Sequence, residues 1–151
     1  MHIARFFSRR SRMPIKFAAA VSGLVLASGM ILAGAAPASA ASGCFENSCT
    51  GKDPNATGCI NTAITVGTFQ IGVQGTLYLR YSTACDAAWA KIINAGIWPV
   101  KIWVHNTDSQ YQFVTTGFGT GSGYTNMVQD GPGFQAQACT DQYGTNCTGW
   151  F

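Results

Sequence analysis

The sequence has few charged side chains, and those it has form no catalytic pattern. Charged residues make up 10% of the 151 residues, and the two histidines are His2 and His105. A lone histidine in the folded part cannot build a multi-histidine metal site, and no serine lies in a G-x-S-x-G elbow. The six acidic residues are scattered, which disfavours a paired-carboxylate glycosidase. Residues 117–123 are rich in glycine but lack a phosphate-loop spacing and lysine, so they predict a β-connection.

Positive charge is concentrated at the N-terminus. Five basic residues lie within residues 1–16, an apolar run follows over 17–36, and Ala38-Ser39-Ala40 supplies a small-residue cleavage site. This order is typical of a bacterial export signal. We therefore expect residues 1–40 to be a signal peptide that is cleaved after Ala40, by the general or the twin-arginine route. An uncleaved membrane anchor and a lipid anchor on Cys44 are the alternatives. The small-residue site favours cleavage, which leaves no stable membrane insertion.

Cleavage would leave a mature chain with little charge of either sign. Six acidic residues remain, against four basic ones, which gives 4 − 6 = −2. The four basic residues are Lys52, Arg80, Lys91 and Lys101. Because no basic patch remains to hold phosphates, nucleic-acid binding is disfavoured.

All cysteines lie beyond the predicted signal. They are Cys44, Cys49, Cys59, Cys85, Cys139 and Cys147. Six cysteines in an exported chain predict three disulfides. The N-terminal spacing matches no C-x-x-C knuckle, so we expect neither metal nor cofactor. Cys139 and Cys147 flank a turn-like segment and are predicted to pair, while Cys85 returns to the N-terminal group.

The remaining sequence predicts an all-β fold over residues 41–151, as one secreted, small, disulfide-stapled β-sandwich or barrel. Residues 43–61 form a cysteine-rich loop region, and short alternating runs follow, cut by Gly, Asn and Asp. Strands are expected at 64–66, 69–73, 76–81, 100–105, 111–115 and 124–128, with a bulge or bend at Gly67. Residues 84–95 fit a strand or one short helix, and the neighbouring β-runs favour the strand. The expected core residues are Leu77, Leu79, Val100, Ile102, Val104 and Phe113.

Two strands carry aromatic side chains on the face opposite their aliphatic residues. Tyr78 and Arg80 alternate with the buried set on one strand, and Trp103 and His105 do so on another. Outward aromatic residues of this kind often mark contact surfaces. We therefore predict that these four residues contact a ligand, with sugar stacking and protein contact both open.

Three blocks of the mature chain resemble a known family. The blocks are Cys44 to Cys59 with Ser-Cys-Thr-Gly-Lys-Asp-Pro inside, Leu79 to Ile92 with Cys85 and Trp89, and Tyr124 to Val128. They resemble the YjfA-type family of small exported bacterial proteins of unknown function. The resemblance implies an exported domain with a four-cysteine pattern and implies no reaction. Cys139 and Cys147 are additional to that pattern.

These features together predict a secreted, extracellular module that is non-catalytic and binds an unknown cell-surface ligand or protein partner. One alternative is a small secreted hydrolase of glycans or peptides, in which two carboxylates and His105 would converge in one cleft. Another is an exported antagonistic or developmental protein.

Overall fold

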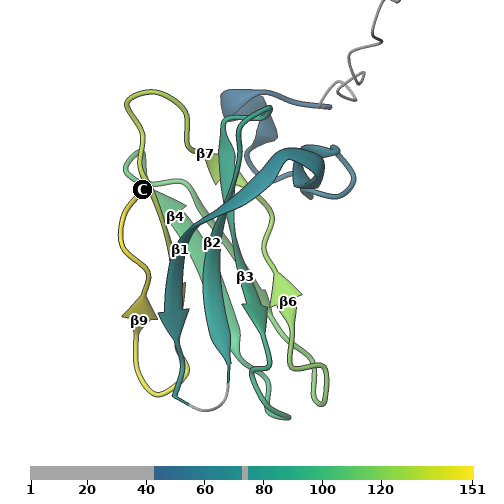
Figure 1. Cartoon of the computed structure of the whole chain (residues 1–151), viewed down its shortest axis with the longest axis vertical. Coiled ribbons are helices and arrows are strands. Elements are labelled where there is room, and N and C mark those ends of the chain that lie inside the picture. The colour runs from purple at the N-terminus through teal and green to yellow at the C-terminus, as the bar shows by residue number, and fades with distance from the viewer. Residues whose placement is uncertain (1–42, 73–74) are drawn as a thin grey trace, which may run out of the picture. The chain divides into compact units, whose positions relative to one another are not determined.

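The computed structural model describes residues 43–72 and 75–151, which are built almost entirely from two antiparallel β-sheets. The first sheet has the order β1 (Ala63–Gln70), β2 (Thr76–Ser82), β3 (Ala87–Ile93) and β6 (Gly123–Tyr124), and β7 (Val128–Gln129) also pairs with β3. The second sheet has the order β5 (Tyr111–Thr115), β4 (Lys101–Asn106), β8 (Ala136–Thr140) and β9 (Asn146–Cys147). The predicted all-β class is confirmed (Figure 1). The predicted signal and its cleavage site lie outside the described residues.

Helical structure in the described residues is limited to two single 3-10 turns. They are η1 (Glu46–Cys49) and η2 (Cys59–Thr62). Both belong to the cysteine-rich region, drawn in blue at the top of Figure 1. No helix over 43–72 and 75–151 is long and apolar enough to cross a membrane.

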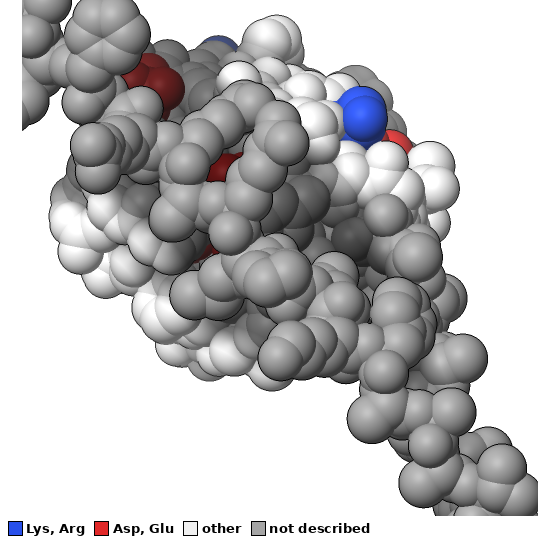
Figure 2. Space-filling view, turned by 90° about the horizontal axis from the view of Figure 1, so that it is seen from above, with Lys and Arg blue, Asp and Glu red and all other residues white. Residues whose placement is uncertain are grey.

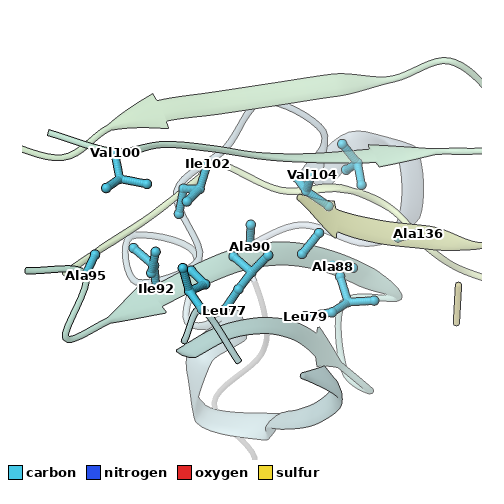
Figure 3. Close-up of a cluster of buried hydrophobic side chains, with 13 residues drawn as sticks. Leu77, Leu79, Ala88, Ala90, Ile92, Ala95, Val100, Ile102, Val104 and Ala136 are labelled. Atoms are coloured by element: carbon cyan, nitrogen blue, oxygen red, sulfur yellow. The ribbon is translucent and has the colours of Figure 1, made fainter. Parts of the chain in front are cut away.

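The hydrophobic core lies between the two sheets. Alternate residues of β2 and β3 point inward from the first sheet, and those of β4 and β8 do so from the second, as Figure 3 shows. The inward residues are Leu77, Leu79, Ala88, Ala90 and Ile92 from the first sheet, and Ile102, Val104, Ala136 and Ala138 from the second. Because both sheets bury one apolar face against the other, the fold is a sandwich. Five of the six predicted core residues are buried: Leu77, Leu79, Val100, Ile102 and Val104.

The prediction that Phe113 belongs to the core is wrong. Phe113 lies directly opposite Trp103 in the pairing of β5 with β4, and it is 60% exposed. Opposed residues of an antiparallel pair point to the same face of the sheet, so an outward Trp103 requires an outward Phe113. Val114, the next residue, packs against the core instead.

The segment with ambiguous spacing, 84–95, contains β3 and not a helix. Ala88 and Ala90 face the main core, while Ala87 and Trp89 on the other face pack against the cysteine-rich region in a second buried cluster. Burial on both faces removes the alternation of apolar and polar residues that normally marks a strand. The strand was therefore hard to recognise from its spacing.

Other strands differ from the prediction in their limits. The run at 64–66 and the start of the run at 69–73 are one strand, β1, which ends at Gln70 and whose register shifts between Thr65 and Gly67, as expected for a bulge. The last residue of the second run, Val73, lies outside the described residues. The run at 124–128 is interrupted, because β6 ends at Tyr124 and β7 starts at Val128. The strands β8 and β9 were not predicted, since both are short and β8 is rich in small residues.

Three disulfides connect all six cysteines, as predicted. They join Cys44 to Cys49, Cys59 to Cys85 and Cys139 to Cys147. The last pair links directly opposed residues of β8 and β9. The other four cysteines are buried together, with all four sulfur atoms within 4.8 Å of one another. These bonds fix the cysteine-rich region to the start of β3 and indicate an oxidising compartment.

Candidate functional site: an aromatic face on the second sheet

The outer face of the second sheet carries a row of aromatic side chains from two neighbouring strands. In the pairing of β4 with β5, Trp103 lies opposite Phe113 and His105 lies opposite Tyr111. All four rings are therefore on one face. Tyr111 is 44% exposed and its ring centroid lies 6.0 Å from that of Phe113.

The C-terminal segment adds a fifth ring to this face. Trp150 is 48% exposed, and its indole stacks on His105 with centroids 5.1 Å apart and planes within 16°. The His105 ring is also fixed by a hydrogen bond between Nε2 and Oε1 of Gln137, at 3.2 Å. Gln137 in turn donates from Nε2 to the backbone oxygen of Thr148. We call Trp103, His105, Tyr111, Phe113 and Trp150 the aromatic face.

One cation lies over the rings. The Nζ atom of Lys101 is 4.7 Å from the ring centroid of Phe113, 5.9 Å from that of Tyr111 and 6.0 Å from that of Trp103. At these distances an ammonium group is attracted by the negative faces of the rings. The arrangement therefore combines a broad apolar surface with one positive charge.

The structure divides the four predicted ligand-contact residues between two surfaces. Trp103 and His105 lie together on the aromatic face, whereas Tyr78 and Arg80 lie on the outer face of the other sheet. The alternation along each strand predicted that both pairs point outward, but it could not predict to which sheet each pair belongs. The rings at positions 111 and 113 were missed because both alternate sets on that strand contain apolar residues. Trp150 gave no signal, because it lies outside any strand.

The hydrolase alternative required His105 to converge with two carboxylates. His105 instead contacts Gln137 and Trp150, neither of which is acidic. The perturbed acid lies elsewhere: burial raises the pKa of Asp130 to about 7, and the nearby charge of Asp86 adds to the effect, while a backbone hydrogen bond from Ala136 opposes it.

The Asp86 carboxylate is engaged by a tyrosine. The hydroxyl of Tyr81 donates to its Oδ1 atom at 2.6 Å. Burial raises the pKa of Tyr81 above its usual range, and this hydrogen bond raises it further. A phenol that is harder to ionise remains a hydrogen-bond donor to Asp86.

The fold and the site together define a disulfide-stabilised antiparallel β-sandwich with an exposed aromatic surface. A family model described as "Protein of unknown function (DUF2690)" matches residues 47–139. The match covers more than half of the chain, and the chain belongs to this family. The prediction of an uncharacterised family is confirmed at that level. No curated protein and no solved structure gives a match.

Proposed function

We propose that the protein is an exported, non-catalytic module that binds a component of the cell surface through its aromatic face. The observation that carries the proposal is the exposure of Tyr111, Phe113 and Trp150 beside Trp103 on one sheet face. A sandwich of this size does not need these rings for its core, because the inward faces of both sheets are already filled by aliphatic residues. Large exposed apolar patches on soluble domains typically mark contact sites.

The site favours a ligand that offers an apolar surface bordered by hydrogen-bonding groups. Sugar rings do so through their C–H faces and hydroxyls, and protein surfaces do so through side chains packed around an aromatic anchor. Export agrees with this use, because disulfides persist in oxidising compartments. We also infer that the chain is of the YjfA type, on the basis of its cysteine and tryptophan spacing.

The experiment is a pull-down of purified mature protein on peptidoglycan, chitin and cell-surface protein extracts. We expect retention on one of these materials and loss of retention in the Trp103→Ala variant. Retention on a purified glycan would identify a sugar ligand, and retention on extract alone would identify a protein partner.

The matched control is Trp98→Ala. Trp98 is 67% exposed but lies in the connection between β3 and β4, where its ring contacts Phe118 and no ring of the aromatic face. The control should bind as the wild type does. Equal loss in both variants, or none in either, would contradict the proposed role of this face. If the protein turned over a glycan or peptide, and His105→Ala abolished that turnover, the non-catalytic part of the proposal would be overturned.

A further inference from the structure

The outer face of the first sheet holds a second arrangement, which is independent of the aromatic face. Lys91 on β3 lies opposite Tyr78 on β2 and opposite Tyr124 on β6. Two residues further along β2, Arg80 lies opposite Trp89 on β3. Two cations and three aromatic residues therefore share one face across three adjacent strands.

Two cavities lie in this face of the sheet. A cavity of about 390 Å³ lies between the cysteine-rich region and the outer face of the sheet. It is lined by Pro54, Asn55, Ile60, Trp89, Lys91, Ser122, Gly123 and Tyr124. A smaller cavity of about 210 Å³ is lined by Thr65, Tyr78, Arg80, Lys91 and Ile93. Lys91 lines both, so the two hollows adjoin at its side chain. We call them together the basic groove. The larger hollow is within the size range of small-molecule sites, which begins near 300 Å³.

The two positive charges of the groove lack acidic partners. Arg80 donates to Oγ1 of Thr65 and, at 2.9 Å, to the backbone oxygen of Ala63, both of which are uncharged. The Lys91 side chain is exposed and makes no hydrogen bond or ion pair with any described residue. Cations without an acidic partner can form charge-assisted hydrogen bonds to a carboxylate or phosphate of a ligand.

Positive charge is otherwise scarce in this part of the chain. Residues 43–151 contain four basic side chains, and two of these four line the groove. Among the described atoms visible in Figure 2, which is seen from above the view of Figure 1, charged side chains are few. The concentration of cations in the groove is therefore local, and too small for a nucleic-acid backbone.

The other groove residues offer uncharged polar groups and an aromatic ring. Asn55 donates from Nδ2 to the Tyr124 hydroxyl at 2.7 Å, and that hydroxyl is 3.2 Å from Oδ2 of Asp53. Asp53 also accepts backbone hydrogen bonds from Asn55 and Ala56 at its Oδ1 atom. An amide, a serine hydroxyl and a partly exposed tyrosine are groups that recognise sugar hydroxyls and C–H faces.

From this geometry we infer that the basic groove binds a sugar that carries one carboxylate or phosphate group. The acidic group lies between Lys91 and Arg80, and the ring occupies the larger hollow beside Tyr124. The inference goes beyond the proposed function and does not depend on it, because it concerns the opposite sheet.

The test is calorimetric titration of the mature protein with three sugars that share one ring. N-acetylmuramic acid carries a lactyl carboxylate, N-acetylglucosamine 6-phosphate carries a phosphate, and N-acetylglucosamine carries no charge. We expect at least one acidic sugar to bind with an affinity about tenfold or more higher than that of the neutral sugar. Added salt should weaken this binding. Comparison of the two acidic sugars identifies the preferred anion. Equal affinity for all three sugars, or no binding of either acid, overturns the inference.

Variants locate the binding. Lys91→Gln and Arg80→Gln should each weaken binding of the acidic sugar about tenfold. Lys101→Gln removes the same charge from the other sheet and should leave the affinity for the acidic sugar unchanged. Trp103→Ala should likewise leave this binding intact, which separates it from the aromatic face. Unchanged affinity in Lys91→Gln, with circular dichroism confirming the native fold, contradicts the inference. So does a loss confined to Trp103→Ala.

Discussion

At the scale of single residues, the direction of a side chain relative to the two sheets decides what it contributes. Leu79 is fully buried between the sheets, whereas the larger Phe113 projects from the outer face and is 60% exposed. Apolar area that stays in contact with water contributes little to folding. Size and hydrophobicity alone would rank these two residues in the opposite order.

Replacement of these two residues by alanine should therefore have unequal effects. Leu79→Ala leaves a cavity among well-packed neighbours and should lower the free energy of unfolding by about 2–5 kcal/mol. Phe113→Ala should change it by no more than about 0.5 kcal/mol, as exposed positions usually do. Urea unfolding followed by tryptophan fluorescence measures both. A cost for Phe113→Ala equal to that for Leu79→Ala would show that Phe113 packs in the core after all.

Asp130 should make stability depend on pH. Its pKa is raised to about 7 from an ordinary value of 3.8, so between these values the folded state holds a proton that the unfolded state has lost. Stability must then decrease as pH rises through this window. We expect Asp130→Asn to gain stability relative to the wild type when urea unfolding at pH 8 is compared with that at pH 5.

The comparison of the two proteins isolates this group, because the other titrating groups are common to both. The Oδ2 atom of Asp130 is buried and has no hydrogen-bond partner among the described residues, so the charged form has no compensation there. Parallel stability–pH curves for wild type and Asp130→Asn would show that the carboxyl titrates normally in the folded protein.

At the scale of elements, alternation predicted the strands that are buried on one face only. β2 and β4 have aliphatic residues inside and polar or aromatic residues outside, and both were predicted together with their core residues. β3 was ambiguous because the cysteine-rich region covers its outer face. The covering depends on contacts distant in sequence, which periodicity does not contain.

The candidate site could be predicted only in part, for a related reason. Alternation gave the outward direction of Tyr78, Arg80, Trp103 and His105. It could not show which strands become neighbours, and strand pairing is what brings Phe113 beside Trp103 and Lys91 beside Tyr78. The groove also requires that the cysteine-rich region folds over the sheet beside Lys91. A pattern in the sequence does not reveal this long-range contact.

The three disulfides should contribute unequally. The bond between Cys59 and Cys85 spans 26 residues, and that between Cys139 and Cys147 spans 8. In the loop-entropy account the longer loop restricts the unfolded chain more, by about 1 kcal/mol. We expect the double variant Cys59→Ser/Cys85→Ser to lose more stability in urea unfolding than Cys139→Ser/Cys147→Ser. The reverse order would mean that the Cys139–Cys147 bond stabilises the native state through packing contacts, which the loop-entropy account leaves out.

At the scale of the whole molecule, export and oxidation are linked. Three disulfides suit an oxidising compartment, and the predicted N-terminal signal would provide the route to it. We expect protein recovered from culture supernatant to begin at Ala41. Reduction should increase its intact mass by six hydrogen atoms, two for each disulfide. A full-length mass found only in membranes would contradict export with cleavage, and free thiols in the unreduced protein would contradict the pairing.

The central claim is that the aromatic face binds a component of the cell surface. It is tested most directly by the binding isotherm of the mature protein on the surface material that retains it, measured for wild type and for Trp103→Ala. Truncation of a central aromatic anchor typically costs about 2 kcal/mol or more, so affinity should fall about thirtyfold or more while the unfolding midpoint changes little. An unchanged isotherm for a folded Trp103→Ala protein would contradict the claim.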